Sequence, residues 1–196
     1  MKFPTNKSLD DLCKRLENYE IDLDRFLAAY LQDSQETDLN NLVGRSAEIV
    51  VETAIRNISD SVTYPIEFPL INGGLETEHY RFSKNDDLIV YRKDSGRIMG
   101  HADIVIKVDG LPAMVEVKTD RKLLRSQKSF RGGVLNALRE YFSHEPAYVL
   151  VIPNDDYSSW ENRQKANDLM INGAKIVHLP ISRNEFRQYV ANRMYS

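Results

Sequence analysis

Residues 100–118 read GHADIVIKVDGLPAMVEVK, two apolar runs joined by Asp109-Gly110. Asp-Gly between two such runs is typical of a β-hairpin with a two-residue turn. Successive side chains of a strand alternate between its two faces. A two-residue turn at Asp109-Gly110 therefore puts one set of polar side chains on a common face of the hairpin: His101, Asp103, Glu116 and Lys118.

In this register Asp103 lies directly opposite Glu116, and His101 lies opposite Lys118. Facing carboxylates destabilise a sheet, and these two sit in strongly apolar strands. A divalent cation between them would remove the repulsion, and oxygen ligands favour Mg²⁺ or Mn²⁺. Lys118 points to the same place and could hold a phosphate oxygen or an attacking water. The competing interpretation is an ordinary polar face, in which Glu116 pairs with Lys118 or Asp103 pairs with Lys107.

The rest of the chain predicts an α/β fold with a mixed central sheet flanked by helices. Apolar residues recur at helical spacing over residues 8–19, 22–33 and 42–58. Strand patterns follow over residues 62–68, 78–82, 88–92, 99–108 and 113–118. Helices and strands then alternate over residues 134–142, 147–152, 158–173, 175–179 and a last helix capped by Ser182 with Glu185. We expect residues 1–41 to form an N-terminal helical extension and residues 42–196 to form one domain.

Composition restricts the classes of function. A chain of 196 residues with 42% hydrophobic and 28% charged residues fits a globular protein. Its apolar runs are too short to span a bilayer, its start lacks the apolar core of a signal peptide, and Cys13 has no disulfide partner. These features predict a cytoplasmic protein without a membrane partner. The net charge of −3 does not indicate general nucleic-acid binding, but residues 117–131 are dense in Lys and Arg and could attract an anionic ligand.

The hairpin residues resemble a known superfamily. Asp103, followed on the next strand by Glu116-Val117-Lys118, resembles the motif of the PD-(D/E)xK phosphodiesterases, although Ala102 stands where that motif often has proline. On the preceding helix, Gly44-Arg45-Ser46-Ala47-Glu48 resembles the Gly-x-x-x-Glu of archaeal Holliday-junction resolvases and some restriction enzymes. The resemblance covers roughly residues 42–152 and implies a restriction-endonuclease-like fold.

The resemblance also implies an activity, namely a Mg²⁺- or Mn²⁺-dependent endonuclease that acts on nucleic acid, with DNA favoured over RNA. It implies that Asp103 and Glu116 bind the metal and that Glu48 binds a second ion or orients water. Lys118 would stabilise the nucleophile and the charge that develops on the phosphate. His101 is a candidate for a supporting hydrogen bond, and a plain strand histidine explains it equally well. A homodimer would suit two cuts in a duplex.

Glu52 competes with Glu48 for the role on the helix. Glu48 lies at the edge of the apolar stripe, whereas Glu52 is turned about 40° further toward water. Glu52 also has Arg56 four residues later, a spacing that favours an ion pair. We therefore predict that Glu48 faces the hairpin carboxylates and that Glu52 is a solvated helix acid.

Nucleic-acid binding is assigned to the basic segment after Lys118, because phosphate charge dominates such affinity. The expected phosphate contacts are Lys122, Arg125, Lys128 and Arg131. An alternative function is a catalytically inactive module of the same fold that binds nucleic acid or a protein partner. A third is an interaction protein without a nucleic-acid role, in which residues 1–40 form the contact surface.

Overall fold

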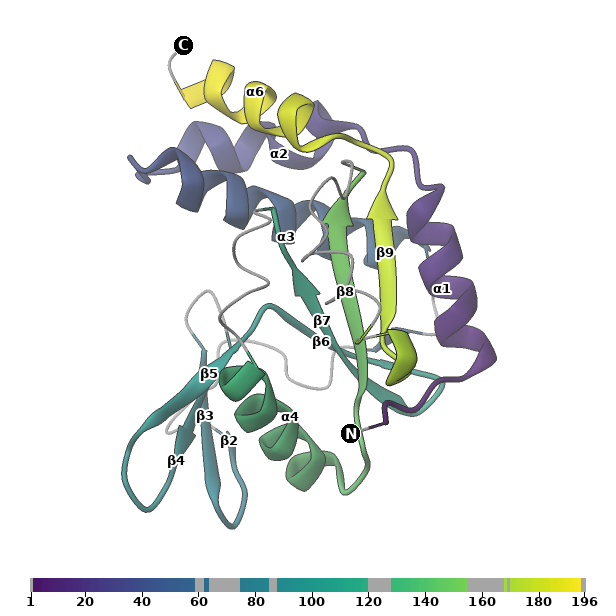
Figure 1. Ribbon diagram of the computed structural model, residues 1–196. Helices are drawn as coiled ribbons and strands as arrows, with labels where there is room; N and C mark the ends of the chain where they lie inside the picture. The colour runs from purple at the N-terminus through teal and green to yellow at the C-terminus, as the bar shows by residue number, and fades with distance from the viewer. Residues whose placement is uncertain are drawn as a thin grey trace.

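A computed structural model of the chain describes residues 2–58, 62–63, 75–84, 88–119, 128–154, 168 and 170–194. These residues form an α/β structure in which helices flank a mixed sheet, as the sequence predicts (Figure 1). The described helices are α1 (Lys7–Glu17), α2 (Leu23–Asp33), α3 (Leu39–Ile58), α4 (Lys128–Phe142) and α6 (Arg183–Met194).

The larger sheet has five strands in the order β1-β6-β7-β8-β9. β6 and β7 pair antiparallel, whereas β7, β8 and β9 run parallel, so the sheet is mixed. Its strands are β1 (Val62–Thr63), β6 (Ile104–Val108), β7 (Leu111–Val117), β8 (Ala147–Pro153) and β9 (Lys175–Leu179). A second, antiparallel sheet contains β2 (Leu75–Glu76), β3 (Tyr80–Lys84), β4 (Leu88–Arg92) and β5 (Ile98–Ala102).

The hairpin of β6 and β7 has the predicted register. Val108 pairs with Leu111, and the ladder runs without a shift to Ile104 opposite Val115. The two turn residues, Asp109-Gly110, have φ values of 47° and 80°. Positive φ at both central residues is what a type I′ turn requires, and Asp and Gly accept it at little cost. The turn chemistry therefore fixes which side chains oppose each other along the hairpin.

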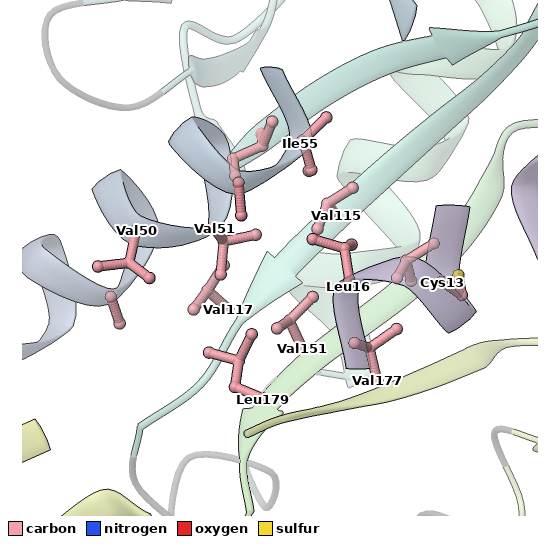
Figure 2. Packing of buried hydrophobic residues seen from close by; sticks show 14 of the residues in the cluster. Cys13, Leu16, Val50, Val51, Ile55, Val115, Val117, Val151, Val177 and Leu179 are labelled. Carbon is pink, nitrogen blue, oxygen red and sulfur yellow. The ribbon is translucent and has the colours of Figure 1, made fainter. Parts of the chain in front are cut away.

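The two faces of the hairpin pack against different layers. Val115 and Val117 lie against Val51 and Ile55 of α3, and β8, β9 and α1 complete this cluster (Figure 2). The opposite face carries Met114 and packs against α4 and the smaller sheet. Because side chains alternate along a strand, Glu116 shares the Met114 face. Val115 and Val117 thus lie on the face opposite Glu116, as the alternation predicts, but the Glu116 face is largely apolar and does not include His101.

The expected strand over residues 99–108 is divided at Asp103. β5 ends at Ala102 in the smaller sheet, and β6 begins at Ile104 in the larger one. Asp103 makes the transition, and its side chain, not a main-chain carbonyl, accepts the hydrogen bond from Val117 N. His101 therefore belongs to β5, where it faces Ile89 of β4 rather than Lys118.

The N-terminal helices are part of the packed core. Leu9 and Leu16 of α1 and Leu27 of α2 are buried in the same cluster as α3 and β7. α1 runs beside β9, and α6 lies across α2 and α3 (Figure 1). Ser182 caps α6 as predicted, since its hydroxyl accepts from Glu185 N at 3.2 Å.

None of the helices in the described part of the chain combines the length and the hydropathy needed to cross a bilayer. Most of the helix expected over residues 158–173 lies outside the described residues.

Candidate active site

Asp103, Glu116 and Lys118 meet where β7 ends. The Lys118 Nζ atom lies 3.3 Å from Asp103 Oδ2 and 3.3 Å from Glu116 Oε1. The side chains of Lys118, Asp103 and Glu116 are only 12%, 11% and 5% exposed, so water screens these charges little. The structure thus brings together three of the four residues that the hairpin register predicted, without His101, and their catalytic and metal-binding roles stay predictions.

Each carboxylate is held by a second hydrogen bond. Asp103 Oδ2 accepts from Val117 N at 2.7 Å, which ties it to the end of β7. The hydroxyl of Tyr148 donates to Glu116 Oε2. Tyr148 lies on β8, fully buried, and its ring stacks on Phe3 with the centroids 5.4 Å apart. These contacts fix both carboxylates before any ligand is bound.

Burial and neighbouring charges have opposite effects on the pKa values of Asp103 and Lys118. Burial raises the pKa of the Asp103 carboxyl above its usual value, and the neighbouring Lys118 ammonium only partly offsets that effect. Burial alone would lower the pKa of Lys118, but the negative charges of Asp103 and Glu116 raise it above its usual value. Lys118 is therefore protonated and positively charged at neutral pH, whereas Asp103 takes up a proton more readily than an ordinary aspartate.

The two carboxylates fit a hard divalent cation. Magnesium in proteins is often held by one or two carboxylates, with waters and substrate phosphates completing its coordination. The hydrogen bonds of Asp103 from Val117 and Lys118 both end on Oδ2, and neither uses Oδ1. The positive charge beside these carboxylates is supplied here by the Lys118 ammonium, so a cation would compete with it or share the site with it.

Glu48 is not joined to this pair as a third ligand. Its Oε2 atom pairs with Arg45 Nη1 at 2.7 Å. Within the described ranges, no group of three or more His, Cys, Asp or Glu side chains is placed to hold a metal ion. Glu52 pairs with Arg56 at 2.8 Å, as predicted. The Glu48 side chain is 17% exposed and that of Glu52 is 35% exposed, in the predicted order.

A cleft of about 860 Å³ opens at the carboxyl end of β7, and both Glu48 and Lys118 line it. Its walls come from α3, from the connection between α2 and α3, and from the first turns of α6. Glu48 therefore reaches the neighbourhood of the cluster through this cleft, from the α3 side of the sheet.

Of the remaining predicted residues, the structure describes only the side chain of His101. His101 is exposed on β5. Lys122 and Arg125 lie outside the described residues, and so do the side chains of Lys128 and Arg131 at the start of α4. The predicted phosphate contacts of that basic segment therefore stay predictions.

Sequence reasoning missed Tyr148 and the arginines Arg183 and Arg187 that line the cleft. Tyr148 sits in the apolar run of β8, and its partnership with Glu116 depends on β8 lying next to β7. The alternation of faces could have put Tyr148 beside Glu116 once that neighbourhood was known. Nothing local in the sequence links α6 to the hairpin.

No family model matches the chain, and neither the curated proteins nor the solved structures compared with it include a match. The functional argument therefore depends on the residues of the site itself.

Proposed function

We propose that the protein is a metal-dependent nuclease of the PD-(D/E)xK type that hydrolyses phosphodiester bonds in nucleic acid, with DNA as the favoured substrate. The observation that carries the proposal is the buried contact of Lys118 Nζ with both Asp103 and Glu116, at 3.3 Å each. Buried, preoriented charges of opposite sign at a cleft are typical of active sites.

Each residue has a definite task in this proposal. Asp103 and Glu116 would hold Mg²⁺ or Mn²⁺, which supplies Lewis acidity and positive charge to the phosphate. Lys118 donates hydrogen bonds to a non-bridging phosphate oxygen, where negative charge grows as water attacks phosphorus and one P–O ester bond breaks. Tyr148 orients Glu116 through its hydroxyl. Glu48 would orient the attacking water or bind a second ion from the cleft side.

The alternative is an inactive module of the same fold. Two observations favour it: the Lys118 ammonium already offsets part of the charge of the two carboxylates, and Glu48 pairs with Arg45. A purely structural ion cluster would need nothing more. The two interpretations differ in what divalent cations do to the protein.

The test is single-turnover cleavage of duplex DNA, single-stranded DNA and RNA in Mg²⁺, Mn²⁺ or EDTA. Wild-type protein should cleave only with Mg²⁺ or Mn²⁺. Asp103→Asn should lose both the cleavage and the rise in melting temperature that Mg²⁺ causes. Lys118→Ala should keep the Mg²⁺-dependent rise and lose about 10²–10³ in rate, as is typical when one preorganised charge is removed.

Glu52→Gln is the matched control, because Glu52 is an acid of α3 that pairs with Arg56 at the surface. It should cleave like the wild type. Cleavage that persists in EDTA, or Asp103→Asn cleaving at the wild-type rate, would reject the proposal. Binding of nucleic acid without cleavage under any of these conditions would establish the inactive module instead.

A further inference from the structure

Cations are numerous among the described residues that line the cleft beside Lys118, although the chain as a whole has a net charge of −3. These cations are Arg45, Lys118, Arg183 and Arg187, and the carboxylates among the same described lining residues are Glu36 and Glu48. Asp103 and Glu116 offset the charge of Lys118, and Glu48 pairs with Arg45. The two arginines of α6 therefore contribute most to the attraction of an anionic ligand.

Two of these cations are arranged as a pair on α6. Arg183 and Arg187 are four residues apart, which places them one turn apart on the same side of the helix. Arg187 Nη1 donates to Asn40 Oδ1 at 2.7 Å, so its guanidinium is held at the cleft wall from the α3 side. A guanidinium has five N–H donors in a planar fork, so one bond to Asn40 leaves others that can reach a phosphate.

The size of the cleft restricts what can enter it. Pockets that enclose drug-sized molecules measure about 300–1,000 Å³, so a cleft of about 860 Å³ suits one or a few nucleotides. A duplex, whose major groove alone is about 12 Å wide, cannot be enclosed in a cleft of this volume and could only lie across its opening. A groove lined by cations is also a usual way to track a single-stranded backbone.

We infer that the cleft binds a single strand of nucleic acid, with Arg183 and Arg187 holding backbone phosphates on the path to Lys118. This inference rests on the proposed nuclease function and adds to it the substrate class and a second phosphate-binding region, apart from residues 117–131. The path starts between α6 and the connection of α2 with α3 and ends at the Asp103–Glu116–Lys118 cluster.

The experiment is fluorescence anisotropy with a labelled single-stranded oligonucleotide and with the blunt duplex of the same length, in Ca²⁺ over a series of salt concentrations. Arg183→Gln and Arg187→Gln each remove one positive charge, and the Gln amide at position 187 keeps a donor for Asn40, the partner of Arg187. Each variant should bind the single strand more weakly, with a salt slope lower by about 0.7 for the lost phosphate contact. Blunt-duplex binding should be unchanged. Arg92→Gln, at an exposed arginine of β4 paired with Asp94, is the matched control.

The inference is overturned if both variants bind the single strand as tightly as Arg92→Gln does. It is also overturned if the variants lose equal affinity for the single strand and for the duplex. Either variant alone carries the test if the other fails to fold. If these variants bind the single strand as the wild type does, and the wild type cleaves in a manner that Asp103→Asn abolishes, the proposed binding cleft is rejected and the proposed nuclease activity stands. If single-strand binding depends on these arginines but no cleavage occurs, the nuclease activity is rejected and the binding role of the cleft stands.

Discussion

Lys118→Met is the most informative single substitution, because it removes the ammonium but keeps an unbranched side chain of similar length. In the wild type, Lys118 Nζ is the cation that compensates two nearly buried carboxylates, each 3.3 Å away. Without it, Asp103 and Glu116 are two like charges in a medium of low polarity. Val117 N would still donate to Asp103, and the Tyr148 hydroxyl would still donate to Glu116.

The expected cost follows from this burial. Removing one partner of a buried ion pair typically costs about 3–5 kcal/mol, because the other charge is left uncompensated. In a domain of this length 1 kcal/mol lowers the melting temperature by about 2–4 °C, so the expected drop is about 6–20 °C. The pKa of Lys118 is raised above 10.5, and a raised pKa contributes stability that is lost only as the pH rises through it. The whole effect is therefore present at pH 7.

The assay is thermal and urea denaturation at pH 7, first in EDTA and then in Mg²⁺. Arg56→Met is the control, since the Arg56–Glu52 pair is exposed and should be worth under about 1 kcal/mol. Mg²⁺ at a hundred times its dissociation constant should restore about 2.7 kcal/mol to Lys118→Met. If Lys118→Met melts like the control, the ammonium does not compensate buried charge. If Mg²⁺ leaves the melting temperature of Lys118→Met unchanged, the carboxylates are not a metal site.

The neighbours of Lys118 give two more tests. Asp103→Asn should be at least as stable as the wild type at pH 7, because burial raises the pKa of Asp103 above 3.8 and its ionisation therefore costs the folded state free energy. In urea denaturation, the stability of the wild type relative to Asp103→Asn should increase as the pH falls from 7 to 4. A large loss of stability in Asp103→Asn at pH 7 would show that the carboxylate has a structural role. Tyr148→Phe should cost about 1.5–3 kcal/mol by the same assay, because it leaves Glu116 Oε2 without its donor, and wild-type stability would contradict that role.

The part of the site that lies on the hairpin could be predicted because its determinants are local. Asp109-Gly110 selects the turn, and the turn fixes a register that runs to Ile104 opposite Val115. Asp103 and Glu116 are the next residues along the chain on each side, and both of their side chains contact Lys118. No contact distant in sequence is needed for this step. Alternation of faces then adds Lys118, two residues beyond Glu116.

The division of the chain at Asp103 could not be predicted in the same way. The apolar pattern on both sides of Asp103 suits a single strand. Ala102 packs with Phe82 and the α4 layer, whereas Ile104 packs with the α3 layer. The chain changes sheets at this point because the residues on either side pack into two separate clusters. As a result, His101 lies in the smaller sheet, opposite Ile89.

The position of Glu48 shows where helix periodicity stops being informative. A helical wheel gives the direction of a side chain around the helix axis, and it correctly ranked Glu48 as more buried than Glu52. It does not say on which face of a sheet the helix lies. α3 packs on the face that carries Val115 and Val117, whereas Glu116 lies on the face that carries Met114.

A carboxylate from α3 can therefore approach the Asp103–Glu116 pair only around the end of β7, where the sheet no longer separates the two layers. Lys118 lies at that end, with its ammonium on both carboxylates and its residue in the wall of the cleft that Glu48 also lines. A phosphate in the cleft would meet Lys118 before it met either carboxylate. The Lys118 ammonium could therefore pair either with the two carboxylates or with a phosphate, all of which are anionic. If it moved to a phosphate, the negative charge of the carboxylates would no longer be offset, and they would attract a divalent cation more strongly. Under the proposed function, the binding of substrate and the binding of metal would therefore favour each other, which a site with a fixed third carboxylate would not require.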